Sequence, residues 1–294
     1  EQDDGNISAN AMLSLAYFHN GEWEKWIELI PTLKRAVPRR EYADFDELFL
    51  GYAWLYIDNQ RSSELLDGVL KKHPTWIFAR MLLATALAHR ASHEVEGKEH
   101  IRRALGEIQV PMVLAGENRF MLMQCLYVHS QAIEVLGDSD GKLEQSADNI
   151  ADQLDRHRDY VVGSIVRAAY YDRRGRTDKA EQACGDVLDH GNGMLVHWAT
   201  AYFVRHGRTS EIISRTWDNR EARVARAYVL ALSPSAEEQN EARRVVEQLA
   251  PTADTWFFRH LIIQVYLLLH DTEQAQELCA NWIGSGAKDT EVDG

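Results

Sequence analysis

The sequence predicts an all-α protein built from paired helices that repeat along the chain. Apolar residues recur three or four positions apart through most of the 294 residues, which places them on one face of successive helices. No stretch alternates apolar and polar residues with turn pairs between, so strands are not expected. Prolines stand between the apolar segments, where a missing backbone N–H costs least; they are Pro38, Pro74, Pro111, Pro234 and Pro251.

The individual helices are predicted from their apolar stripes and their starting residues. After Gly21, one helical face is expected to carry Trp23, Trp26, Ile27, Ile30 and Leu33. The last helix is expected to carry a similar face of Ala275, Leu278, Cys279, Trp282 and Ile283. Two capping-box spacings predict helix starts, because each side chain can bond the other's free backbone N–H; these are Asp178 with Glu181, and Ser235 with Glu238.

Taken in order, the helices are expected to form one repeat domain over residues 1–283. About seven pairs are expected, at approximately 6–37, 44–73, 75–109, 115–156, 158–190, 193–217 and 219–283. Residues 284–294 are small, polar and rich in glycine, and are expected to be a disordered tail.

The pairs recur at a similar distance. Pro38 and Pro74, which end successive pairs, are 36 residues apart. Gly175 and Gly207 lie in the similar strings RRGRT and RHGRT and are 32 residues apart. Helix–turn–helix units with a period of about 34 residues are typical of a helical solenoid.

The repeats resemble tetratricopeptide repeats. The first pair places a leucine, a tyrosine, a turn glycine, two large apolar residues and a final proline where that family keeps such residues, at Leu13, Tyr17, Gly21, Trp23, Ile30 and Pro38. A later pair matches at Ala168, Tyr171, Gly175 and Ala180. The resemblance implies a right-handed α-solenoid whose first helices line an inner face, and a non-catalytic scaffold that binds a protein or peptide there.

The same resemblance implies a peptide-binding groove. Carrying the family's groove positions onto this chain gives Phe78, Met81, Thr85, His89, Asn118, Met121, Cys125, His129, Val162, Ile165, Asp172, Arg173, His197 and Arg205. This mixture of apolar, sulfur-bearing and imidazole groups suits an extended or helical peptide with hydrophobic anchors.

Three strings resemble a narrower group. Residues 47–58 (ELFLGYAWLYID), 79–89 (ARMLLATALAH) and 124–132 (QCLYVHSQA) are similar to the repeat region that follows the kinase domain in many large bacterial serine/threonine kinases. That resemblance implies a regulatory or docking arm of such an enzyme.

The charge and the cysteines narrow the expected partners and location. A net charge of −13 argues against nucleic acid and membrane surfaces and favours a basic or neutral peptide. The most apolar stretch, 256–269, is shorter than the roughly 20 residues a membrane helix needs. Three scattered cysteines form neither a disulfide framework nor a zinc spacing, and reduced thiols fit the cytoplasm.

Two alternatives remain open from the sequence. If the last helix covers segment 256–269 incompletely, the C-terminal helices would form a homodimer. In the second alternative, a metal-dependent hydrolase, His89 and His93 lie one helical turn apart and bind a metal with Glu94 or Glu96 nearby. No HExxH or paired-cysteine motif supplies a third ligand, so the leading expectation is a chain without catalysis, cofactor or metal.

Overall fold

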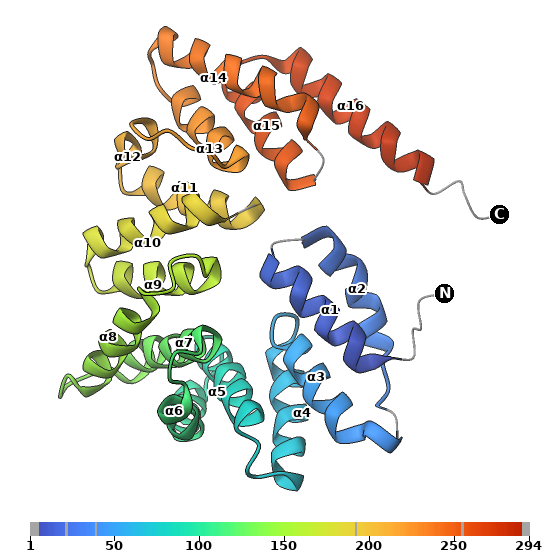
Figure 1. Ribbon diagram of the computed structural model, residues 1–294, viewed down its shortest axis with the longest axis vertical. Coiled ribbons are helices and arrows are strands. Elements are labelled where there is room, and N and C mark those ends of the chain that lie inside the picture. Colours follow the sequence, from blue (N-terminus) through green and yellow to red (C-terminus); the bar gives the residue numbers. More distant parts are fainter. Residues whose placement is uncertain (1–5, 21–22, 39, 192, 254–255, 290–294) are drawn as a thin grey trace. The chain divides into compact units, whose positions relative to one another are not determined.

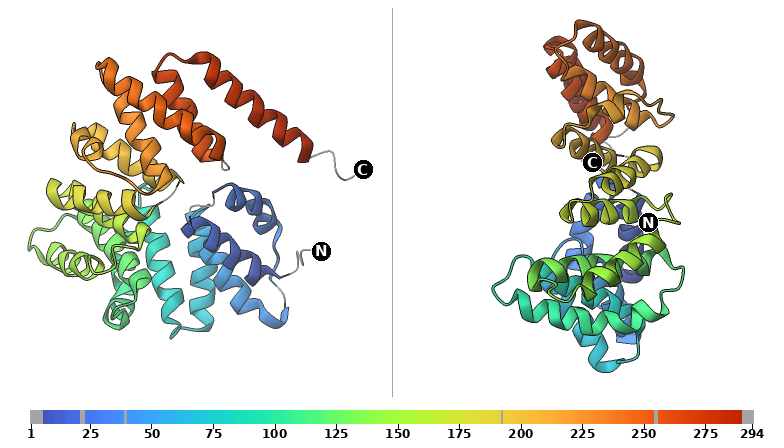
Figure 2. Two further views of the ribbon diagram at one scale, coloured as in Figure 1. Left: turned by 45° about the horizontal axis from the view of Figure 1, so that its top comes forward. Right: turned by 90° about the vertical axis from the view of Figure 1, so that its left-hand side faces the viewer.

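A computed structural model describes residues 6–20, 23–38, 40–191, 193–253 and 256–289 (Figures 1 and 2). All regular structure in these ranges is helical, which confirms the all-α prediction for this part of the chain. The chain divides into two compact units, residues 1–183 and 184–294, hereafter unit 1 and unit 2.

Unit 1 is a series of helices that pack against their neighbours in the chain. The helices are α1 (Ile7–Asn20), α2 (Trp23–Arg35), α3 (Ala43–Trp54), α4 (Asn59–Lys72), α5 (Ile77–Ala91), α6 (Gly97–Leu114), α7 (Arg119–Leu136), α8 (Lys142–Leu154) and α9 (Val161–Arg173), with a short 3-10 turn at Arg40–Tyr42. Consecutive helices pack together in the pair α1–α2 and from α3 through α9, and α1 also packs on α3, α5 on α7, and α7 on α9. The first helices of successive pairs therefore form a continuous layer, an arrangement compatible with a helical repeat.

Unit 2 continues the same kind of packing. Helix α10 (Thr177–His190) spans the boundary between the units, and it is followed by α11 (Gly193–Arg205), α12 (Thr209–Ile213), α13 (Arg220–Ala231), α14 (Ala236–Leu249), a 3-10 turn at Ala250–Thr252, α15 (Trp256–Leu268) and α16 (Thr272–Asp289). Here α11 packs on α13, and α13 packs on both α14 and α15.

Three helix boundaries differ from the sequence expectation. Segment 219–283 holds four helices, α13 to α16, where one pair was expected. Pro111, expected between helices, lies inside α6, which continues to Leu114. Proline has no backbone N–H, so the helix lacks one hydrogen bond at this position. Helix α16 continues to Asp289, so the expected tail 284–294 begins as helix; residues 290–294 lie outside the described part of the chain.

At some helix starts a side chain accepts a hydrogen bond from a backbone N–H group, as at Asp58, Asn118, Asn219 and Ser235. Ser235 caps α14 by accepting from the Glu238 backbone N–H at 3.5 Å, which confirms that predicted start. Asn118 caps α7 in the same way, accepting from the Met121 N–H at 3.1 Å. The start predicted at Asp178 is two residues late: a cap at Asp178 would begin the helix at Lys179, whereas α10 begins at Thr177 and Asp178 lies in its first turn.

The two glycine turns identified in the sequence have the same backbone geometry. Gly175 and Gly207 have φ angles of 66° and 67°, in the left-handed region that favours glycine. In each turn the residue after the glycine donates to a carbonyl five positions back: Arg176 to Tyr171 at 2.9 Å and Arg208 to Phe203 at 2.9 Å. Gly21, the turn expected in the first pair, lies outside the described residues.

Apolar stripes decide most of the burial, but the stripe predicted for α2 is only partly buried. Leu33 is buried as expected, and Trp26 and Ile30 are partly buried. Ile27, predicted on the same stripe, is 58% exposed. The side chain of Trp23 lies outside the described part.

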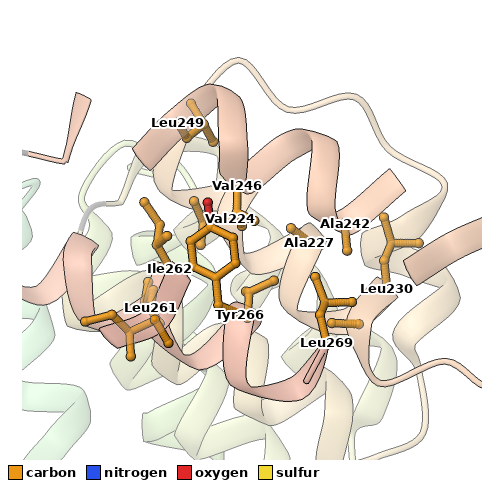
Figure 3. Packing of buried hydrophobic residues seen from close by; sticks show 14 of the residues in the cluster. Val224, Ala227, Leu230, Ala242, Val246, Leu249, Leu261, Ile262, Tyr266 and Leu269 are labelled. Atoms are coloured by element: carbon orange, nitrogen blue, oxygen red, sulfur yellow. The ribbon is translucent and has the colours of Figure 1, made fainter. Parts of the chain in front are cut away.

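The core of unit 2 shows how three helices share apolar cover (Figure 3). Val224 and Ala227 of α13 meet Val246 of α14, and Ile262 and Tyr266 of α15 close the cluster; all are buried. Each large apolar side chain contributes on the order of 2 kcal/mol when it leaves water. None of these helices could bury its own apolar stripe alone, so the contacts among the three helices stabilise the unit.

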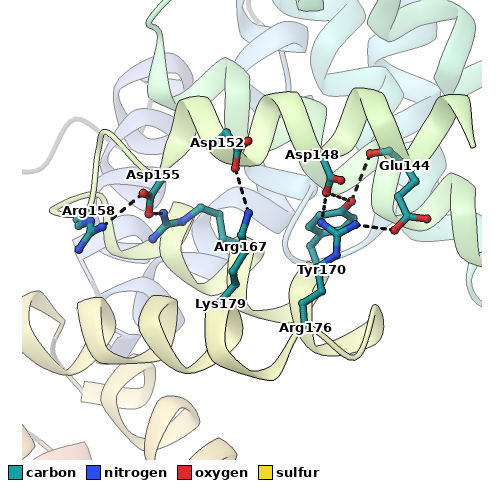
Figure 4. Close-up of polar contacts among 9 residues, drawn as sticks. All are labelled: Glu144, Asp148, Asp152, Asp155, Arg158, Arg167, Tyr170, Arg176 and Lys179. Carbon is teal, nitrogen blue, oxygen red and sulfur yellow. Dashed lines mark hydrogen bonds and ion pairs between the residues drawn. The ribbon is translucent and has the colours of Figure 1, made fainter.

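A polar network joins α8, α9 and the start of α10 (Figure 4). Asp148 of α8 accepts hydrogen bonds from the Tyr170 hydroxyl at 2.7 Å and the Arg176 guanidinium at 2.5 Å. At the other end of α8, Asp155 pairs with the buried guanidinium of Arg167 from α9. These charges fix the spacing of three successive helices.

Candidate functional site

The first-helix layer of unit 1 carries a cluster of aromatic side chains, which we call the aromatic row. It consists of Tyr52 on α3, Phe78 on α5, Phe120 on α7 and Tyr160 directly before α9. The ring of Tyr52 lies 5.5 Å from that of Phe78 and 5.6 Å from that of Phe120, and the Phe78 and Phe120 rings are 6.2 Å apart. These separations are typical of interacting aromatic pairs.

The aromatic row is partly open to solvent. Phe78 is 36% exposed, Phe120 and Tyr160 are partly buried, and Tyr52 is buried beneath them. Phe78 and Phe120 are each the second residue of their helix, so the repeat brings equivalent positions together. Large rigid rings that are half-covered offer apolar contact area at little cost in side-chain entropy.

Charged groups border the aromatic row at Tyr160. The Arg119 guanidinium lies 5.1 Å from the centre of the Tyr160 ring and pairs with the Asp159 carboxylate at 3.0 Å. The Tyr160 hydroxyl lies 3.6 Å from the sulfur of Met123. Burial raises the pKa of the Tyr52 and Tyr160 hydroxyls, so both are neutral donors at neutral pH.

A second, more polar set of side chains joins α5 to α7. The Thr85 hydroxyl lies 2.8 Å from Gln124 Oε1, and the Tyr127 hydroxyl lies 2.8 Å from His89 Nδ1. Burial, together with the nearby charge of His93, lowers the pKa of His89 to about 4, so its imidazole is neutral at pH 7. These contacts hold two first helices together.

The structure places the fourteen predicted groove residues at three depths. The exposed ones are Phe78, Asn118, Arg173 and Arg205. The partly buried ones are His89, Met121, Val162, Ile165, Asp172 and His197. The buried ones are Met81, Thr85, Cys125 and His129.

The four buried residues are core residues of unit 1, which corrects their assignment to an open groove surface. Met81 is 0% exposed because α5 is covered by α4, α6 and α7. His129 points toward α8: its Nδ1 donates to the Cys125 carbonyl at 2.8 Å and its Nε2 lies 3.2 Å from the Ser146 hydroxyl. Burial lowers the pKa of His129 and raises that of the Cys125 thiol to about 12, so both are uncharged at neutral pH.

Several of the remaining predicted residues have other roles or lie in unit 2. Asn118 caps α7, and Arg173 pairs with Glu134 at 2.9 Å. His197 and Arg205 belong to unit 2. Phe78 alone joins the aromatic row; Tyr52, Phe120 and Tyr160 were missed. An aromatic residue at the start of successive first helices was the signal that could have found Phe120 and Tyr160, but not Tyr52, which lies in the last turn of α3.

The described residues do not assemble the metal site of the hydrolase alternative. No group of three or more His, Cys, Asp or Glu side chains in this part of the chain is placed to hold a metal ion. Glu94 is instead paired with Arg90 at 2.7 Å and with His100 at 2.8 Å. Separately, none of the described helices combines the length and the apolar character required to cross a membrane.

Comparison with known proteins gives no assignment, because no protein family, curated protein or solved structure matches the chain.

Proposed function

We propose that this chain is a non-catalytic scaffold of the tetratricopeptide-like kind that binds peptide segments on the first-helix face of unit 1. The aromatic row is the observation that carries the proposal. The rings of Phe78 and Phe120 are partly exposed, belong to two successive helix pairs and lie 6.2 Å apart, close enough to contact one bound segment. Central aromatic side chains are frequent sources of binding energy in protein interfaces.

The partner that fits this face is a basic or neutral segment with apolar anchors. Aromatic rings bind apolar side chains and also attract cations over their faces. The chain's net charge of −13 raises the local concentration of basic segments over acidic ones, and this effect weakens as salt screens it. Polar groups at Arg119 and Asp159 would then set the register of the segment.

Fluorescence anisotropy with three synthetic peptides of equal length tests the proposal. One peptide is lysine-rich with phenylalanine and leucine anchors, the second carries the same anchors with glutamate, and the third is lysine-rich with serine in place of the anchors. We expect binding of the first peptide only. Phe78→Ala should weaken that binding about tenfold, since it removes an exposed anchor contact.

The matched control is Leu114→Ala, which removes an exposed apolar side chain from α6, the second helix of the same pair. It should leave the affinity unchanged, and circular dichroism should show both variants folded. Equal affinities of wild type and Phe78→Ala, or equal weakening by the two variants, would contradict the proposal.

We further propose that the scaffold serves as the docking arm of a bacterial serine/threonine kinase. This rests on the resemblance of the strings at 47–58, 79–89 and 124–132. The complete reading frame tests it: a kinase domain ahead of Glu1 would support the proposal, and a frame without one would contradict it.

Self-assembly through the C-terminal helices is a second candidate, favoured by one observation. Leu267 on α15 is 51% exposed, while the residues around it, Tyr266 and Leu269, are buried. Light scattering of wild type and Leu267→Glu distinguishes the candidates. A dimer that becomes monomeric in the variant would establish self-assembly, and a monomer mass independent of concentration would rule it out.

A further inference from the structure

Unit 2 contains a cavity of about 360 Å3 between the loop that follows α12 and the helices α13 and α14. Arg215 and the hydroxyl residues Ser214 and Thr216 line it from the loop, Arg223 and Arg226 from α13, and Glu241 from α14. Cavities of this size are typical of small-ligand sites. We call it the arginine pocket.

The arginine pocket is positively charged, although the chain as a whole carries −13. Its lining residues include three arginines and a single acidic residue, Glu241. Guanidinium groups stay charged at all relevant pH values, so the pocket retains a net charge of about +2. Such a concentration of charge favours an anion with more than one negative charge.

Two of the three guanidinium groups are held in place by neighbouring groups. Arg226 donates through Nε to the Ile213 carbonyl at 3.0 Å and through Nη1 to Glu241 at 2.7 Å. Arg223 donates through Nη2 to Gln248 at 2.7 Å. Each retains further N–H groups that can donate to a ligand.

Arg215 has its donors available. Within the described part of the chain its guanidinium makes no hydrogen bond or ion pair, and it lies 5.6 Å from the centre of the Trp217 ring. Trp217 is buried and donates from its indole N–H to the Ile212 carbonyl at 3.1 Å, which fixes the ring. Gly185 gives the guanidinium room, because a Cβ there would lie 3.1 Å from Arg215 Nη1.

We propose that the arginine pocket binds a phosphate group, either free or as a monoester. A phosphate monoester carries about −1.5 to −2 charges at neutral pH and three acceptor oxygens, which matches a pocket of net charge about +2. Guanidinium groups bind phosphate oxygens with two parallel hydrogen bonds, and the hydroxyls of Ser214 and Thr216 add donors. The proposal concerns unit 2 and is independent of peptide binding on unit 1.

Isothermal titration calorimetry of the full chain with inorganic phosphate tests the site. We expect saturable binding to wild type. Arg215→Gln should weaken it about tenfold, because it removes the guanidinium with the most available donors. Arg223→Gln should weaken it several-fold. Arg244→Gln, an exposed residue of α14 outside the pocket, makes the same charge change and should have no effect.

A phosphoserine peptide and its unphosphorylated twin then identify the source of the phosphate. Tighter binding of the phosphopeptide than of inorganic phosphate would assign the site to phosphorylated protein segments, and equal binding would assign it to free phosphate or small esters. Absence of saturable binding by both probes, or equal weakening by Arg215→Gln and Arg244→Gln, would overturn the proposal.

Discussion

The imidazole of His89 lies against Tyr127 in unit 1, with the two rings 4.4 Å apart. Burial and the nearby His93 lower its pKa from 6.5 to about 4. In the unfolded chain the same group takes up a proton near its ordinary pKa. Between these two pKa values the unfolded state binds more protons than the folded state. The free energy of unfolding is therefore highest above pH ~6.5 and decreases as the pH drops toward ~4.

His89→Gln should therefore reduce the pH dependence of stability. Glutamine can still accept the Tyr127 hydroxyl but cannot be protonated. The loss of unfolding free energy between pH 7.5 and pH 5 should shrink by about 2 kcal/mol in the variant. Urea unfolding at the two pH values measures it.

His190→Gln, at an exposed histidine of α10, is the control and should leave the pH dependence as in wild type. If His89→Gln loses as much unfolding free energy on acidification as wild type, the lowered pKa of the buried His89 would be contradicted.

At the scale of the element, Asp148 connects three helices through one carboxylate. Burial acts to raise its pKa, but hydrogen bonds from Arg176 and Tyr170 outweigh that effect and lower it. Because the folded state lowers the pKa of Asp148, the carboxylate stabilises the fold at any pH above its unfolded pKa. This stabilisation is lost as the pH falls through the lower pKa of the folded state. The network is therefore intact at neutral pH and fails in acid.

Asp148→Ala should destabilise the protein by about 1–2 kcal/mol, because the Tyr170 hydroxyl and the Arg176 guanidinium lose their shared acceptor. The matched control lies one helical turn away. Asp152→Ala removes an exposed carboxylate that pairs with Lys179 at 3.3 Å, and exposed pairs contribute little. Denaturant unfolding of both variants measures the difference, and equal losses would show that the network of Asp148 adds nothing.

At the scale of the whole molecule, helices pack mainly with the next helix or the next but one in the chain. In such an array, the free energy of unfolding is approximately the sum of the stabilities of the individual helix pairs and of the interfaces between neighbouring pairs. A destabilising substitution therefore affects only the nearby helices. Unit 1 allows this to be tested because its ends, α1 and α9, are far apart in the series.

Leu33→Ala in α2 removes a buried side chain from the cluster shared by α1, α2 and α3. The cavity should cost about 2–5 kcal/mol locally. Hydrogen exchange should accelerate in α1 to α3 and remain as in wild type in α7 to α9. Uniform acceleration over the whole of unit 1 would mean that it unfolds as one cooperative body instead.

The local chemistry of the sequence was enough to determine the helices. The burial of Leu33, the cap at Ser235 and the turns at Gly175 and Gly207 were predicted correctly. Hydrophobic periodicity, capping and left-handed glycines act within a few residues, so a single sequence displays them. For the same reason the prediction at Pro111 was wrong. Local chemistry favours a helix break at proline, but α6 continues through it.

Which residues are covered beyond the main apolar stripe of each helix depended on the tertiary structure. Met81 and Cys125 resemble groove residues in sequence, yet neighbouring helices bury them on every side. The aromatic row joins residues from four separate segments, and the arginine pocket joins a loop to two helices. Burial and proximity are properties of the packed neighbours, and a helix's own periodicity carries no information about what lies against its other faces.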